Sequence, residues 1–319
     1  MIFQGLIEKM YRGMMFRRCE EHDTARYFDA EDFEGIKKEP YEFKNQKGET
    51  LRGAFYSAEV KFYNRIVIFE HGMGSGHRAY MREIVTLARH GYLVYSYDRT
   101  GCVSSDGDGI RGFGGSIADL DDCLKALKSD TRFSGYDFSV IGHIWGGLST
   151  LNVAAYHPDV SHLVAISGPR SVEAMHTQIF SGLLKYYKKH IYSIETETNP
   201  DYVGASAIEA LRSTEAQVLI IHSEDDKVVS AKIHFDPLAE ALCHKENIRF
   251  LKVSGKNHNP NYTVDAVNYL AEYSSANRKQ RKKLKTEKDK QAFVSSFDWL
   301  RMTEQDPEVW KEIFAVLDK

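Results

Sequence analysis

Short runs of apolar residues recur along the chain, and amphipathic stretches separate them. Continuous apolar runs of this kind are typical of strands that are buried on both faces of a sheet. They lie at residues 65–69, 92–97, 140–141, 163–166, 218–221 and 248–253. Between them, residues 79–89 and 117–127 place apolar side chains at helical spacing. This alternation of strand and helix predicts an α/β fold with a mostly parallel central sheet.

The two ends of the chain carry further patterns. Residues 41–43 and 51–56 flank a turn at Gly48 and predict an antiparallel hairpin. Before the hairpin, apolar and basic residues mix at helical spacing: Ile2, Phe3, Leu6, Ile7, Met10, Met14, Lys9, Arg12, Arg17 and Arg18. A terminal helix docked on the domain explains this stripe best, and a helix on a membrane surface is the alternative. Residues 271–319 are predicted to form a C-terminal helical extension that docks back on the domain.

Composition limits the possible functions. The chain has 319 residues, 42% of them hydrophobic, and a net charge of −3, so it can bury one large core and has no general attraction to nucleic acid. A basic run at residues 278–285 lacks interleaved aromatics, which favours a solvated helix or linker. The four cysteines are scattered without close pairs, and no stretch is long and apolar enough for a membrane span. We therefore expect a single cytoplasmic domain over residues 1–319, without metal, organic cofactor, nucleic-acid partner or integral membrane association.

One motif gives a direct link to chemistry. An apolar strand end at Val140 runs into the sequence Gly142-His143-Ile144-Trp145-Gly146-Gly147 and then into a helix. This arrangement resembles the nucleophile elbow, G-x-S-x-G, of the α/β-hydrolase fold, and its flanks resemble the G-H-S-W-G-G form of the esterase and lipase-like branch. The frame glycines Gly142 and Gly146 are present, but Ile144 occupies the serine position.

The resemblance implies positions for the other catalytic groups. In this family the acid follows a strand, which places it at Asp226, and the base follows the last strand, which places it at His258. The order nucleophile, acid, base is the one that the fold uses. The loop at His71 and Gly72 resembles the family's H-G-x-G loop, which implies that the backbone amides of Met73 and Trp145 form an oxyanion hole.

The resemblance also implies a helical cap over the site, inserted at residues 170–213. This segment is rich in aliphatic and aromatic residues, among which Tyr186 and Tyr187 are candidate substrate contacts. Such a lining suits an apolar acyl or aryl group, although the same residues could simply pack the cap onto the core. The expected partner is a small-molecule ester or a hydrophobic ligand, and the sequence specifies neither an oligomeric state nor a choice between ester and amide.

The missing serine decides the functional hypotheses. Ile144 has no nucleophilic or ionisable atom, so an acyl-enzyme cannot form at this position. The leading hypothesis is an esterase-like hydrolase in an inactive or nearly inactive form, and the alternative is a natural pseudoenzyme that binds a small hydrophobic ligand in the remnant pocket. Slow hydrolysis by water, with His258 as general base, is a third possibility. We also expect Ile144 to be strained, because an elbow residue adopts positive φ and a β-branched side chain resists it.

Overall fold

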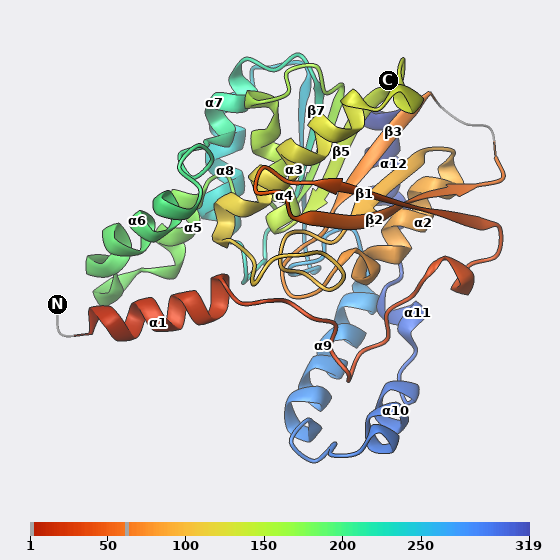
Figure 1. The fold of residues 1–319 in the computed structure, drawn as a ribbon, viewed down its shortest axis with the longest axis vertical. Helices are drawn as coiled ribbons and strands as arrows, with labels where there is room; N and C mark the ends of the chain where they lie inside the picture. The colour runs from red at the N-terminus through yellow and green to blue at the C-terminus, as the bar shows by residue number, and fades with distance from the viewer. Residues whose placement is uncertain (1–2, 61–63) are drawn as a thin grey trace.

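A single eight-stranded sheet organises the fold in the computed structural model, which describes residues 3–60 and 64–319 (Figure 1). The strands are β1 (Ile36–Lys44), β2 (Thr50–Ala58), β3 (Arg65–Glu70), β4 (Leu93–Tyr97), β5 (Asp137–His143), β6 (His162–Ile166), β7 (Gln217–Ser223) and β8 (Ile248–Val253). Their order across the sheet is β1-β2-β4-β3-β5-β6-β7-β8. β2 is antiparallel to β1 and β4, and all later pairs are parallel. The predicted α/β fold with a mostly parallel sheet is confirmed.

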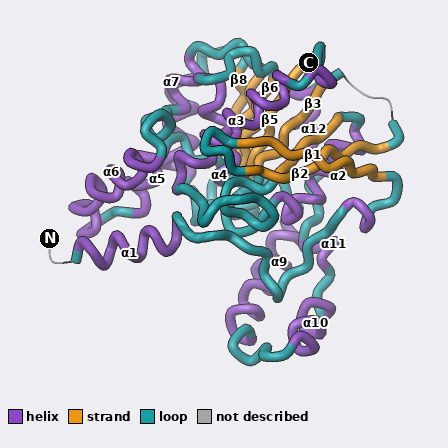
Figure 2. The backbone as a smooth tube through the Cα atoms, in the orientation of Figure 1, coloured by secondary structure: helices purple, strands orange, loops and turns teal. Residues whose placement is uncertain are grey.

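Helices cover both faces of this sheet (Figure 2). They are α1 (Gln4–Met15), α2 (Met81–His90), α3 (Gly112–Ser129), α4 (Trp145–Asn152), α5 (Val172–Ile179), α6 (Lys188–Thr198), α7 (Ala207–Arg212), α8 (Ala231–Leu242), α9 (Val264–Gln280), α10 (Glu287–Ser295), α11 (Trp299–Met302) and α12 (Pro307–Leu317). Neighbouring residues of β3 face opposite layers. Ile66 packs in one core cluster with Leu120 of α3, whereas Val67 packs in the other with Ile84 of α2 and Ile313 of α12.

Helix α3 begins earlier than the apolar pattern predicts. The expected helix covered residues 117–127, but α3 starts at Gly112 and includes the glycine-rich turn before that range. The carboxylate of Glu195, from α6, accepts hydrogen bonds from the backbone N–H groups of Phe113 and Gly114 at 3.0 and 3.3 Å. Free N–H groups at a helix start need such acceptors. A distant side chain therefore supplies the cap, which local sequence cannot reveal.

The segment predicted as a cap contains α5, the 3₁₀ turn η5 (Gly182–Tyr187), α6 and α7. Figure 1 shows α5 and α6 at one end of the molecule, next to α1, whereas α7 lies against the sheet layer. Residues 271–319 contain the end of α9 and the helices α10, α11 and α12, and α12 returns to the core, where Ile313 and Leu317 are fully buried. Helices α9 and α10 extend away from the sheet (Figure 1). Within the described ranges, no helix combines the length and apolarity needed to cross a bilayer.

Candidate active site

The turn between β5 and α4 has the geometry of a nucleophile elbow. Ile144 adopts φ 56° and ψ −109°, and its backbone N–H donates to the carbonyl oxygen of Ile166 in β6 at 3.1 Å. The two frame glycines are sterically required. A Cβ on Gly146 would lie 2.0 Å from the carbonyl oxygen of Glu70, and one on Gly142 would lie 2.3 Å from that of Gly146. The elbow is therefore intact, and it holds a β-branched residue in a conformation that costs about 1–3 kcal/mol.

Asp226 and His258 come together as the sequence predicts. The Asp226 carboxylate follows β7 and accepts hydrogen bonds from the backbone N–H groups of Val228 and Val229 at 2.8 and 2.9 Å. Its other oxygen lies 2.7 Å from Nδ1 of His258, in the loop after β8. Burial alone would raise the pKa of Asp226, but the hydrogen bond and charge of His258 lower it overall. An ionised acid thus holds the imidazole in one orientation.

The second imidazole nitrogen of His258 is the one that would face a nucleophile. Nε2 is buried and has no hydrogen-bond partner among the residues that the structure describes. Buried polar nitrogens are normally paired. An unpaired nitrogen beside a formed aspartate–histidine pair is what a missing serine hydroxyl would leave.

His143 connects the elbow to the base, a role that the sequence analysis did not assign. Its Nε2 lies 2.8 Å from the carbonyl oxygen of His258, and its Nδ1 lies 3.0 Å from the hydroxyl of Tyr80. Burial, with the nearby charge of His258, lowers the pKa of His143 to about 3, so the ring is neutral. Because a carbonyl can only accept, Nε2 carries the proton and Nδ1 accepts from Tyr80. The only local sign of this role was a histidine between the frame glycine and position 144.

The two amides predicted for an oxyanion hole lie at adjacent strand ends. Glu70 of β3 and Gly142 of β5 are register partners, and Met73 and Trp145 each follow three residues later. Trp145 is the first residue of α4, where helix N–H groups lack intrahelical acceptors. The carbonyl of Gly72 is turned away, because it accepts from Nη2 of Arg99 at 2.7 Å. The arrangement fits the oxyanion prediction for Met73 and Trp145, which remains a prediction.

Comparisons with known proteins agree with this geometry. The sequence model of the family described as serine aminopeptidase, S33, matches residues 63–209, a little under half of the chain. An esterase of Pyrococcus furiosus superposes with a TM-score of 0.60 at 19% identity, over 82% of this chain and 95% of its own. The hydrolase GrgF of a Penicillium species gives 0.53 at 18% identity, over 77% and 97%. The chain has the α/β-hydrolase fold.

Other comparisons set limits on this result. An acylaminoacyl peptidase of Pyrococcus horikoshii has a TM-score of 0.52 at 14% identity, over 70% of this chain and 37% of its own. A search of curated protein sequences gave no match. At these identities the structural likeness shows the fold, which this chain shares with esterases and with a peptidase.

A buried cation contacts the two loops that carry the candidate oxyanion donors. Arg99 follows β4, its guanidinium lies over the ring of Trp145 at 5.6 Å, and its backbone N–H donates to Nε2 of His71 at 3.1 Å. The carboxyl group of Glu70 is fully buried behind the elbow, near the Arg99 guanidinium. Burial raises the pKa of Glu70 to about 7, although the charge of Arg99 opposes this rise. Arg99 therefore fixes both loops that carry the candidate oxyanion donors.

Two cysteines that are far apart in the sequence meet beside the same loop. Cys19 and Cys102 are partners in a parallel backbone bridge, which brings the two residues side by side. The Cys102 thiol lowers the pKa of Cys19 to about 6 against the effect of burial, helped by the N–H of Gly74 and the charge of Arg99. The four cysteines are scattered along the sequence and are free thiols in the structure, and this pair meets only through the fold, because contact between segments 83 residues apart has no local signal.

The cap residues around the elbow differ from the candidates chosen by sequence. Tyr186 is 62% exposed, and Tyr187 next to it is half-buried, both in the outer turn η5. The ring of Trp145 instead packs on Phe113 at 4.8 Å, in a cluster that also contains Phe180 and contacts the side chain of Ile144. The aromatic lining of the elbow therefore comes from the start of α3 and from the residue after α5.

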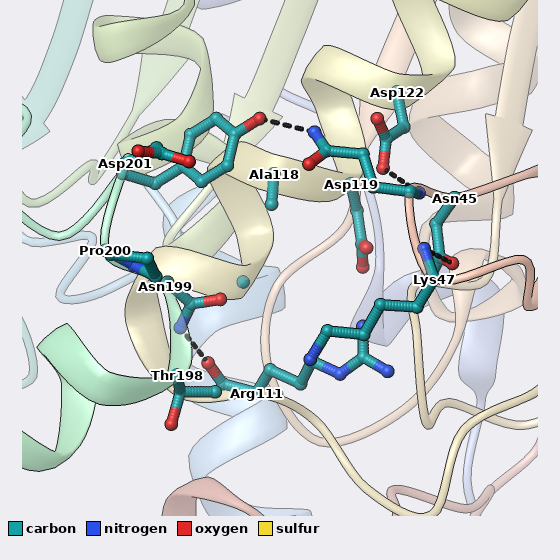
Figure 3. Close-up of a pocket in the computed structure, with 13 residues that line it drawn as sticks. Asn45, Lys47, Arg111, Ala118, Asp119, Asp122, Thr198, Asn199, Pro200 and Asp201 are labelled. Atoms are coloured by element: carbon teal, nitrogen blue, oxygen red, sulfur yellow. Dashed lines mark hydrogen bonds between the residues drawn. The ribbon is translucent and has the colours of Figure 1, made fainter.

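A separate cavity of about 190 Å³ lies between the β1–β2 turn, α3 and the end of α6 (Figure 3). Its polar groups bind one another. Gln46 donates to the hydroxyl of Tyr202 at 2.7 Å and to Asp122 at 2.9 Å, and Asn199 donates to the carbonyl of Arg111 at 2.6 Å. Because these donors are already used within the protein, the cavity fits a structural joint between the hairpin and the cap segment.

Proposed function

We propose that this chain is a carboxylic ester hydrolase scaffold, related to serine esterases, in which Ile144 prevents the acyl-enzyme step. The observation that carries the proposal is the formed Asp226–His258 pair with an unpaired, buried Nε2, next to an intact elbow. A scaffold that had never used a nucleophile here would not need this pair. The expected state of the chain is inactive or nearly inactive.

A serine at position 144 would complete a known reaction sequence. Nε2 of His258 would take the hydroxyl proton, and Asp226 would stabilise the resulting imidazolium. The N–H groups of Met73 and Trp145 would donate to the oxyanion. With isoleucine there is no atom to acylate, and only attack by water remains. Enzymes that lack a triad member retain about 10³–10⁴-fold catalysis over water.

The lining of the elbow favours an ester with an apolar acyl group. An aminopeptidase, the activity named by the matching family, would need an anion for the substrate's ammonium group. Ile144 packs against an apolar cluster that includes Met175 and Phe180. Glu195 and Glu70 are buried acids of this region. Glu195 is occupied by Tyr11 and by the start of α3, and Glu70 lies behind the elbow near the charge of Arg99.

The decisive experiment compares the chain with its Ile144→Ser variant on short and medium p-nitrophenyl esters, with fluorophosphonate labelling of both. We expect the serine variant to gain turnover by roughly 10³-fold or more and to be labelled. The Ile144→Ala variant tests whether any gain in turnover comes only from the smaller side chain. The double variant Ile144→Ser with His258→Ala lacks the general base, so it should show neither turnover nor labelling. A folded serine variant that neither turns over nor labels would contradict the proposal.

A second candidate is a natural pseudoenzyme that binds a small hydrophobic ligand. The packing of Ile144 into the apolar cluster around Trp145 favours it, because the strained residue then adds apolar contact surface. Calorimetric titration with medium-chain fatty acids tests it directly. Saturable binding by the native chain, together with a silent Ile144→Ser variant, would favour binding over a disabled esterase.

A further inference from the structure

Helix α1 has two apolar faces, and only one of them is covered. Tyr11 and Met15 point into the protein and are buried. The opposite side exposes Phe3, Leu6, Met10 and Met14 to between 57% and 60%. Single exposed apolar residues are common, but four on one helix face form a patch.

The helix is held firmly, so this exposure does not reflect a loose end. The hydroxyl of Tyr11 donates to the fully buried carboxylate of Glu195 at 2.5 Å and lies 2.8 Å from Nε2 of His176. At the surface, Glu8 bridges Arg12 and His190 at 2.9 Å each. Figure 1 shows α1 lying beside α5 and α6 at one end of the molecule. α1 is thus a rigid edge of the domain.

The turn η5 extends the patch. Leu183 is 85% exposed, and Leu184 and Tyr186 are also exposed. Between η5 and α1 runs a groove of about 220 Å³ whose lining has no polar surface, formed in part by Met10, Met14 and Leu184. We call this surface the apolar rim; it consists of Phe3, Leu6, Met10, Met14, Leu183, Leu184 and Tyr186.

Basic residues outnumber acids around the apolar rim. Residues 3–17 contain Lys9, Arg12 and Arg17 against a single acid, Glu8, which is already paired with Arg12 and His190. Residues 181–190 contain three lysines and no acid; Lys188 is paired with Glu173 of α5 at 3.2 Å, whereas Lys185 and Lys189 form no ion pair among the described residues. The whole chain has a net charge of −3, so these two segments are a local positive region. Exposed apolar residues framed by basic ones match the surface of an anionic bilayer.

We infer that the apolar rim docks this protein onto an anionic lipid surface, with the rim in the interface and the flanking lysines on lipid phosphates. A second copy of the chain fits less well, because two such faces would bring like charges together. Docking here would place the cap end of the protein at the membrane. The inference does not depend on the chemistry at Ile144, since the rim contains neither Ile144 nor His258.

Sedimentation of the full native chain with vesicles tests this inference. We expect binding to phosphatidylcholine mixed with phosphatidylglycerol, weaker binding at high salt, and little binding to phosphatidylcholine alone. The pair Lys185→Gln and Lys189→Gln should weaken binding roughly thirtyfold. The pair Leu6→Gln and Met10→Gln should also release the protein, and Leu183→Gln serves as an independent variant should those two perturb α1.

Matched controls make the result specific. Leu300→Gln removes a comparably exposed apolar residue elsewhere, and Lys282→Gln with Lys283→Gln removes two charges from the distant basic run; both should leave binding unchanged. Loss of binding in the Lys282 and Lys283 variant alone would overturn the inference. Binding to neutral vesicles that equals binding to anionic ones, or no binding to either kind, would also overturn the inference. The same holds for a dimer in light scattering that the Leu6→Gln and Met10→Gln pair abolishes.

Discussion

His258 and Asp226 are hydrogen-bonded at 2.7 Å, Nδ1 to Oδ2, in a chain whose nucleophile position is an isoleucine. The pair is built without any contribution from residue 144. Two backbone N–H groups of the following turn orient the aspartate, and His143 fixes the backbone of His258. The hydrogen-bonded pair of Asp226 and His258 therefore forms even though the nucleophile is absent.

Asp226→Asn should lower the free energy of unfolding by about 1–3 kcal/mol at pH 7, because it weakens a charge-assisted hydrogen bond inside the protein. The pKa of Asp226 is lower in the folded state than its ordinary value of 3.8. Its contribution is then present above that value and is lost as the pH falls through the lower, folded value. Urea unfolding at several pH values should show that the free energies of unfolding of the native chain and of Asp226→Asn become equal at acidic pH. The exposed Asp201→Asn is the control, and a constant difference at all pH values would contradict the prediction.

Ile144→Ala should cost less than about 1 kcal/mol of stability, although isoleucine truncations in cores cost about 2–5 kcal/mol. Ile144 is half-buried, and alanine relieves part of the strain of a β-branched residue at φ 56°. Ile141, three residues earlier and fully buried in β5, is the matched comparison. Urea denaturation of Ile144→Ala and Ile141→Ala measures both. Equal losses would show that Ile144 is a normal core residue without strain.

Glu70→Gln should flatten the pH dependence of stability. The pKa of Glu70 is about 7 in the folded protein and 4.5 ordinarily, so the folded state keeps a proton in this window that the unfolded state has lost. Its stabilising contribution is complete below about pH 4.5 and is lost as the pH rises through 7. The variant should remove up to about 3 kcal/mol of that decline.

The measurement is urea unfolding of the native chain and of Glu70→Gln between pH 5 and about 8. The exposed Glu197→Gln changes the same side-chain type on α6 and should follow the native curve. Parallel curves for the native chain and Glu70→Gln would show that Glu70 is ionised throughout.

Those parts of the fold that depend on local pattern could be predicted from the sequence. The buried strands are continuous apolar runs, and the elbow motif is recognisable in the sequence from Gly142 to Gly146. Asp226 and His258 could be placed through the resemblance to the α/β-hydrolase family, which implies an acid and a base in the loops that follow two strands of the sheet.

Contacts between distant segments could not be predicted in this way. His143 bonds to Tyr80, which is 63 residues earlier, and the cap of α3 comes from Glu195. Tyr186 seemed suited to the site by residue type, yet η5 turns it outward. In each case the partner is decided by how helices pack on the sheet, which a pattern within one element does not contain.

Cys19 should ionise near pH 6, because the Cys102 thiol, the N–H of Gly74 and the charge of Arg99 together stabilise its thiolate. The ultraviolet absorbance of thiolate during a pH titration measures this without requiring access to the buried sulfur. The step should disappear in Cys19→Ser and move to higher pH in Cys102→Ala, which removes the donor.

Cys243→Ser is the matched control, because Cys243 is exposed and lies away from the pair. Its titration should keep the step near pH 6, and circular dichroism should show that all variants remain folded over the range. If the native chain shows no thiolate absorbance until the pH approaches the ordinary thiol value of about 8.5, the neighbouring Cys102 thiol does not stabilise a thiolate at Cys19, and the prediction is wrong.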